Sequence, residues 1–112
     1  MKARIYHNPR CSKSRAALAL LNERGVAVEI VDYIAAPPPR AELAALLQKL
    51  GVAPLEMIRR DDPEIAKRAA QSPERVLDLL VEHPRALQRP IVEVGARAVI
   101  GRPPERVLEL LE

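Results

Sequence analysis

A strand, a helix and a second strand follow one another within residues 1–31, and this order restricts the possible folds more than any other feature of the chain. Residues 3–6 are mainly apolar and suit a short buried strand, and an amphipathic helix is predicted from about Ser12 to Arg24. Gly25 can end that helix, and residues 26–31 are rich in the β-branched side chains that strands favour. Two strands joined by a helix within about thirty residues form a parallel βαβ unit with a right-handed crossover.

The middle of the chain, from about residue 40 to residue 84, is predicted to be a helical insert. Leucines recur at helical spacing between residues 40 and 50. Prolines, N-cap residues and a glycine mark the starts and stops of helices, and these signals are Pro37–Pro39, Gly51, Asp62–Pro63, Ser72–Pro73 and Pro84. We therefore expect this segment to be helical throughout.

Strand signals return only near the end of the chain. Residues 91–94 and 97–100 are apolar and β-branched, and the short Gly95–Ala96 connection predicts an antiparallel hairpin. Pro103 and Pro104 then open a final helix with an apolar side. Residues 1–112 are thus predicted to be a single α/β domain with a four-stranded mixed sheet, in the order βαβ, helical insert, ββα. This is the thioredoxin-like arrangement.

Composition excludes several classes of protein. The chain holds one cysteine, which cannot form an internal disulfide and which, with His7 and His83, offers too few ligands for a zinc site. No apolar run approaches the ~20 residues of a membrane span, and the N-terminus lacks the apolar stretch of a signal peptide. We therefore expect a cytoplasmic monomer that binds neither a metal nor a membrane.

The net charge of +3 raises the question of nucleic-acid binding. The positive residues are scattered, however, and Tyr6 and Tyr33 are the only aromatic residues. Proteins that bind single strands need more aromatic surface for stacking, so no nucleic acid is expected as a partner. A small domain rich in arginine suits a small oxyanion better.

Cys11 is placed where the first helix is predicted to begin. A helix N-terminus carries a partial positive charge and unpaired N–H groups, both of which favour a thiolate. Arg10, Lys13 and Arg15 add positive charge nearby, and His7 would add more when it is protonated. A lone cysteine is often a small buried hydrophobe, but this polar surrounding favours exposure. Cys11 is therefore predicted to be a reactive thiol with a depressed pKa.

Five segments of the chain resemble the glutaredoxin-dependent arsenate reductases, a family with the thioredoxin-like fold. They occur in that family's order and at its spacing, and together they extend over nearly the whole chain. The matching segments are YHNPRCSKSR (6–15), PPPRAEL (37–43), MIRR (57–60), LQRPIV (87–92) and GRPPE (101–105). Related thiol-based transcription regulators share the fold and some of these segments.

The resemblance implies an arsenate reductase with an oxyanion site around Cys11. In the family's terms Cys11 attacks arsenate, and Arg59, Arg89 and Arg102 stand where the family places its oxyanion-binding arginines. Because Arg60 follows Arg59 directly, the first of these three arginines is either Arg59 or Arg60. Guanidinium groups pair bidentately with oxyanions, lower the pKa of a nearby thiol and stabilise charge on a pentavalent intermediate.

The resemblance also implies supporting residues and co-reactants. His7 and Ser14 occupy positions that favour the thiolate, and Pro90 is expected to follow a cis peptide bond beside the thiol. The resemblance implies that no cofactor is bound. In the family's terms, glutathione is the external thiol that attacks the arsenate adduct, and glutaredoxin resolves the product so that arsenite is released. A chain with one cysteine needs an external thiol in any case, because disulfide exchange requires a second sulfur.

Other functions match the residues less well. A thiol-based phosphatase needs Cys-x₅-Arg, but Ala17 is at that position, and a two-cysteine oxidoreductase needs a cysteine where Ser14 stands. The turn Ser12–Arg15 replaces a Gly-Thr pair of the best-known family members, so the substrate stays open between arsenate, another oxyanion and a thiol adduct. The remaining alternative is a non-catalytic regulator or protein-binding module, which has no need for three arginines around one thiol.

Overall fold

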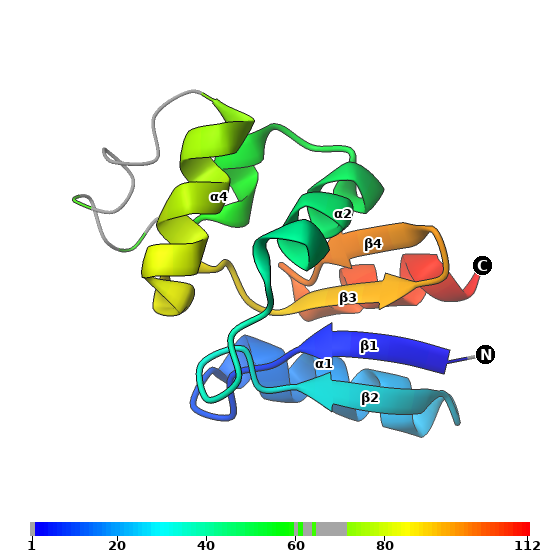
Figure 1. Cartoon of the computed structure of the whole chain (residues 1–112). Coiled ribbons are helices and arrows are strands. Elements are labelled where there is room, and N and C mark those ends of the chain that lie inside the picture. Colours follow the sequence, from blue (N-terminus) through cyan, green and yellow to red (C-terminus); the bar gives the residue numbers. More distant parts are fainter. Residues whose placement is uncertain (1, 60, 62–63, 65–71) are drawn as a thin grey trace.

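The computed structural model describes residues 2–59, 61, 64 and 72–112. Its centre is a four-stranded sheet with the strand order β2-β1-β3-β4 (Figure 1). In this sheet β2 runs parallel to β1, whereas β3 is antiparallel to both β1 and β4. The elements in chain order are β1 (Lys2–Tyr6), α1 (Ser12–Glu23), β2 (Ala27–Val31), α2 (Arg40–Leu50), η1 (Pro54–Met57), α4 (Pro73–Glu82), η2 (Pro84–Ala86), β3 (Ile91–Val94), β4 (Arg97–Ile100) and η3 (Pro104–Leu111).

The N-terminal βαβ unit has the predicted form. β1 and β2 pair in parallel, and the N–H group of His7 extends their ladder by donating to the carbonyl oxygen of Val31 at 3.0 Å. β3 returns beside β1 with Val92 opposite Ile5, and a tight turn leads into β4. The predicted mixed four-stranded sheet and its thioredoxin-like order are therefore confirmed.

Helices cover both faces of the sheet and create two hydrophobic cores (Figure 1). Ile5 and Val92 are fully buried in the core that also contains residues of α1 and η3. Their chain neighbours Tyr6 and Ile91 are fully buried in the core that contains residues of α2 and α4. Successive side chains of a strand point to opposite faces, so each strand contributes to both cores. This double burial holds the ends of β1 and β3 firmly at the position of the site described below.

The final helix differs from a simple amphipathic α-helix. Residues Pro104–Leu111 form a 3₁₀-helix, with Val107 and Leu110 as its buried side chains. A 3₁₀-helix has three residues per turn, so two residues three apart in the sequence lie on one face. The spacing of the apolar residues fits either kind of helix, and the structure contains the tighter one, with its apolar side packed against α1 and the sheet.

The predicted helical insert contains α2, η1, α4 and η2. It is not helical throughout, because Ile58 is extended and forms a β-bridge with Leu87. At the start of α4 the hydroxyl of Ser72 accepts a hydrogen bond from the N–H group of Arg75 at 3.2 Å, and Pro73 is the first helical residue, as expected for this N-cap pair. The other predicted start, at Asp62–Pro63, lies outside the described residues. No helix in the described ranges has the length and apolar character needed to cross a membrane.

Candidate active site

Cys11 is the N-cap residue of α1, as predicted from its place in the sequence. Its N–H group donates to the carbonyl oxygen of Asn8 at 3.0 Å, and its own carbonyl oxygen accepts from the N–H group of Arg15 at 3.0 Å. The first of these bonds closes the turn between β1 and α1, and the second begins the helix. The thiol is thereby fixed at the helix end where unpaired N–H groups converge.

The pKa of the Cys11 thiol is lowered from its ordinary value. Burial acts in the opposite direction, but hydrogen bonds from the backbone N–H groups of Ser14 and Lys13 favour the thiolate. The positive charges of Arg89 and Arg102 lower the pKa further. These two arginines lie far from Cys11 in the sequence, so the fold brings their charges to the thiol.

Ser14 supports the loop before the helix with its side chain. Its hydroxyl is fully buried, accepts a hydrogen bond from the N–H group of Asn8 at 3.1 Å and lies 2.6 Å from Nδ1 of His7. Arg15 stabilises the same loop, because its Nη1 donates a hydrogen bond to the carbonyl oxygen of Pro9 at 2.7 Å. Ser14 thus holds the loop through its hydroxyl and favours the thiolate through its backbone N–H group.

His7 is buried beside Ser14 in the loop that precedes α1. Burial lowers the pKa of its imidazole, and the charge of Arg15 acts in the same direction, although Asp32 opposes both. An imidazole with a lowered pKa is mainly neutral at pH 7. The lowered pKa favours a neutral imidazole, and the contact of Nδ1 with the hydroxyl of Ser14 places His7 in the support of the loop.

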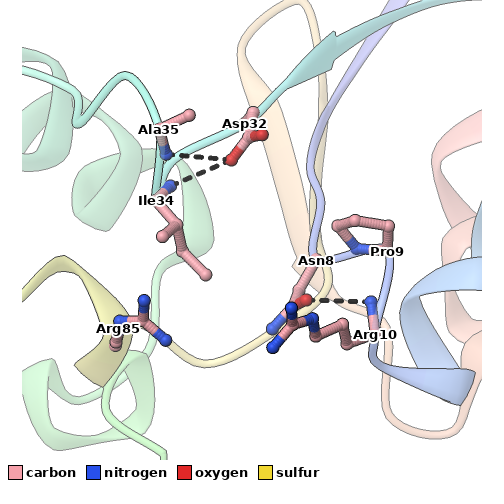
Figure 2. Close-up of a pocket in the computed structure, with 7 residues that line it drawn as sticks. All are labelled: Asn8, Pro9, Arg10, Asp32, Ile34, Ala35 and Arg85. Atoms are coloured by element: carbon pink, nitrogen blue, oxygen red, sulfur yellow. Dashed lines mark hydrogen bonds between the residues drawn. The ribbon is translucent and has the colours of Figure 1, made fainter.

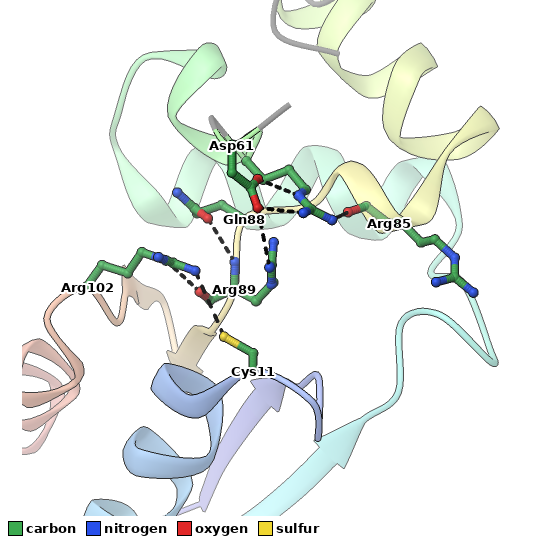
Figure 3. A network of polar contacts seen from close by, with 7 residues as sticks. Cys11, Asp61, Arg85, Gln88, Arg89 and Arg102 are labelled. Atoms are coloured by element: carbon green, nitrogen blue, oxygen red, sulfur yellow. Dashed lines mark hydrogen bonds and ion pairs between the residues drawn. The ribbon is translucent and has the colours of Figure 1, made fainter. Parts of the chain in front are cut away.

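Arg89 and Arg102 lie at the thiol although 78 and 91 positions separate them from Cys11 in the sequence. Nη2 of Arg102 is 3.9 Å from Sγ of Cys11, and Nε of Arg102 donates to the carbonyl oxygen of Arg89 at 2.8 Å (Figure 3). The Arg89 side chain is 15% exposed, and within the described residues its buried Nε donates to no acceptor. A buried charged donor without a partner is costly, and a bound anion would remove that cost.

Gly101 allows the two segments that carry these arginines to pack closely. A Cβ at Gly101 would lie 2.8 Å from Cγ of Pro90 and 3.1 Å from Cγ1 of Val107. The N–H group of Gly101 also donates to the carbonyl oxygen of Pro90 at 2.9 Å. The Arg89–Pro90 peptide bond is cis, as expected, and the Arg102–Pro103 bond is cis as well.

A cavity of about 360 Å³ lies over the thiol (Figure 3). It is lined by Cys11, Ser12, Lys13, Asp61, Gln88, Arg89 and Arg102. The cavity therefore joins the start of α1 to two of the three predicted arginines. Basic side chains and a helix N-terminus around one opening suit a small oxyanion in contact with sulfur.

Arg59 is near this cavity but does not line it. The chain after η1 is held by a bridge between Ile58 and Leu87 and by a 2.9 Å hydrogen bond from the N–H group of Arg59 to the carbonyl oxygen of Ala86. The Arg59 side chain is paired with Asp61, which does line the cavity. Arg59, the third arginine expected at the site, is thus connected to the cavity by its ion pair with Asp61.

Asp61 and Gln88 are site residues that the sequence did not single out. Gln88 accepts a hydrogen bond through Oε1 from the N–H group of Arg89 at 3.3 Å. Asp61 follows the MIRR segment directly, and an acid two residues after Arg59 was the one available signal of a pair. Arg60, the alternative to Arg59, lies outside the described residues.

A second cavity of about 250 Å³ lies beside the loop that leads to Cys11 (Figure 2). Its lining comprises Asn8, Pro9, Arg10, Asp32, Ile34, Ala35 and Arg85. Asp32 is oriented by hydrogen bonds that its Oδ1 accepts from the N–H groups of Ile34 and Ala35, at 3.2 and 3.0 Å. Two guanidinium groups and one carboxylate therefore line this cavity, and Arg10 in its lining directly precedes Cys11 in the sequence.

The described part of the chain contains no group of three His, Cys, Asp or Glu side chains that could hold a metal ion.

Comparison with known proteins identifies the family of this chain. Residues 6–110 match the model of the ArsC family. An arsenate reductase of Neisseria meningitidis serogroup A is 42% identical over 113 residues, which span 96% of this chain and 97% of that protein. The Escherichia coli protein YfgD, named as uncharacterized, is 41% identical over 98% of this chain and 97% of its own length. The solved structure of an arsenate reductase from Vibrio cholerae has a TM-score of 0.90 and 38% identity, and 98% of each chain is covered. The chain belongs to the ArsC family.

Proposed function

We propose that this protein reduces arsenate to arsenite, with Cys11 as the nucleophile and Arg89 and Arg102 as the groups that bind the oxyanion. The observation that supports this most is the position of Arg102, whose Nη2 is 3.9 Å from Sγ of a thiol with a lowered pKa. The unpartnered Nε of Arg89 on the same cavity is a second donor for the anion. The names of the relatives are consistent with this reaction.

The first step is displacement at arsenic by the thiolate of Cys11. A sulfur–arsenic bond forms, an arsenic–oxygen bond breaks, and the departing oxygen leaves as water after taking up protons. Arsenic stays pentavalent in this step. Arg89 and Arg102 stabilise the negative charge that gathers on the arsenate oxygens, and the N–H groups at the start of α1 contribute in the same way.

Two external thiols supply the two electrons. The thiol of glutathione replaces a second arsenic–oxygen bond and releases water. The thiolate of glutaredoxin then attacks the sulfur of that glutathione, the arsenic–sulfur bond breaks, and its electron pair stays on arsenic, which becomes trivalent. The two thiols leave as a mixed disulfide, and hydrolysis of the bond between Cys11 and arsenic releases arsenite. One cysteine in the chain supports this external route, since no resolving cysteine is present.

We further propose that glutathione occupies the second cavity. Its γ-glutamyl end carries a carboxylate and an ammonium group, which match the guanidinium groups of Arg10 and Arg85 and the carboxylate of Asp32 (Figure 2). Arg10 lines this cavity and directly precedes Cys11, so a ligand bound here would lie beside the loop that carries the thiol. Replacing Arg85 by Ala is expected to raise KM for glutathione several-fold and to leave KM for arsenate unchanged.

The proposed reaction is tested by arsenate-dependent oxidation of NADPH, coupled through glutathione, glutaredoxin and glutathione reductase. Cys11→Ser is expected to abolish turnover without unfolding the protein, because serine is a favoured N-cap residue. Arg24→Lys, at the opposite end of α1, is the control and should keep full activity. A normal rate in Cys11→Ser, or no arsenate-dependent rate in the unmodified protein, contradicts the proposal.

A further inference from the structure

The guanidinium group of Arg59 is already occupied by an internal anion. Nε of Arg59 donates to Oδ1 of Asp61 at 2.6 Å, and Nη2 of Arg59 donates to Oδ2 at 2.6 Å. Oδ2 of Asp61 also lies 3.8 Å from Nη2 of Arg89. One carboxylate therefore bridges two of the three arginines expected to bind the oxyanion, and it does so on the wall of the cavity that holds Cys11 (Figure 3).

The bidentate edge of a guanidinium group can serve one partner at a time. The Nε and Nη2 edge that Asp61 uses on Arg59 is the edge with which an arginine binds two oxygens of a tetrahedral anion. The remaining nitrogen, Nη1, points to the carbonyl oxygen of Arg85 at 3.5 Å. An arsenate ion that is to bind this edge of Arg59 must first displace the carboxylate.

The charge state and exposure of Asp61 suit such a displacement. The hydrogen bonds from Arg59 lower the pKa of this carboxyl to about 2, so it is ionised at any pH at which the thiol reacts. The Asp61 side chain is 57% exposed, and exposed ion pairs are held weakly because water can replace either partner. The carboxylate can therefore leave the arginines and be solvated.

We propose that Asp61 is a specificity-determining residue, an internal anion that competes with the substrate oxyanion for Arg59 and Arg89 and so sets the affinity of the cavity. The identity of the oxyanion rests on the proposed function, whereas competition for the cavity does not. An anion that binds must overcome both the pairing of Asp61 with the arginines and the repulsion between like charges. A weakly held anion gains too little from the remaining donors to displace the carboxylate.

The test removes the charge and keeps the shape. In a Cys11→Ser background, in which no covalent step can occur, sulfate is titrated into the protein and binding is measured by isothermal calorimetry. Asp61→Asn is expected to tighten sulfate binding about tenfold, the effect of removing one like charge a few ångströms away at a partly exposed site. Asp78→Asn is the matched control, because Asp78 is 63% exposed, pairs with Arg40 on another face and loses the same unit of charge.

Several results overturn the proposal. Unchanged or weaker sulfate binding in Asp61→Asn means that the carboxylate orients the arginines without competing, and an equal gain in Asp78→Asn means that net charge alone is responsible. Sulfate binding in none of these variants means that there is no anion for Asp61 to compete with. A second readout is kinetic: with Cys11 restored, Asp61→Asn should lower KM for arsenate. Tighter sulfate binding without arsenate turnover would leave the competition intact and refute only the proposed function.

Discussion

Removal of the charge on Arg102 should raise the pKa of the Cys11 thiol by a measurable amount. Nη2 of Arg102 is 3.9 Å from Sγ of Cys11. At about 4 Å a unit charge pair is worth about 1 kcal/mol in bulk water and about 4 kcal/mol at an effective dielectric constant of 20. With 1.36 kcal/mol per pKa unit, these limits correspond to shifts of roughly 0.7 and 3 units.

The lower part of that range is expected, because the thiol is partly exposed and salt screens the interaction. Arg102→Gln, which keeps a hydrogen-bond donor and loses the charge, should therefore raise the pKa of Cys11 by about one unit. The sign follows from the charged form: the thiolate loses a stabilising cation, so a higher pH is needed to form it. The measurement is the rate of iodoacetamide alkylation as a function of pH, whose midpoint reports the thiol pKa.

Arg24→Gln is the control for this measurement. Arg24 caps the C-terminal end of α1, about 20 Å from Cys11 at a rise of 1.5 Å per residue. This distance is about twice the Debye length at 0.1 M salt, so its charge is screened from the thiol. A shift of less than about 0.3 units in Arg102→Gln, or an equal shift in Arg24→Gln, would refute the electrostatic role of Arg102.

Three further predictions concern a residue that binds the anion and two residues that support the site. Arg89→Lys keeps the charge but loses the planar fork, so kcat/KM for arsenate in the coupled assay should fall at least about tenfold, and a fall of less than twofold contradicts the role of the fork. Gly101→Ala places a Cβ 2.8 Å from Cγ of Pro90. It should lower the free energy of unfolding by about 1–3 kcal/mol in urea denaturation and reduce activity. Unchanged stability would mean that the segments around Pro90 and Gly101 move apart without cost. Ser14→Ala removes the hydroxyl that binds Asn8 and His7 and should lower the free energy of unfolding by about 1–3 kcal/mol, whereas Ser12→Ala, at an exposed position, should change it by less than about 0.5 kcal/mol.

The order of strands and helices was predictable because it depends on local signals. The apolar run of β1, the glycine after α1 and the β-branched residues of β2 act over a few residues, and together they predicted the βαβ unit that the structure contains. Ser72 and Pro73 predicted the start of α4 in the same way. The 3₁₀ form of Pro104–Leu111 was not predictable, because apolar residues three apart fit both kinds of helix.

The resemblance to the arsenate reductase family was also available from the sequence, and the match to the ArsC family confirms it. It indicated Arg89 and Arg102, which the structure places at the thiol. It did not indicate that Arg59 would be paired with Asp61, since a family pattern names positions and not the partner that a side chain takes in one chain.

The helix that begins at Cys11 follows from neighbouring residues, because a turn, an N-cap position and an amphipathic repeat are local properties of the chain. Which charges act on the thiol depends on the tertiary fold. Arg89, just before β3, and Arg102, just after β4, lie at the thiol, while the sequence neighbour His7 is buried and its pKa is lowered. A pKa depends on the burial and on the charges within a few ångströms, and both follow from how segments far apart in the chain pack together. Asp61 is close to Arg59 in the sequence, but only the same packing brings it within 3.8 Å of Arg89.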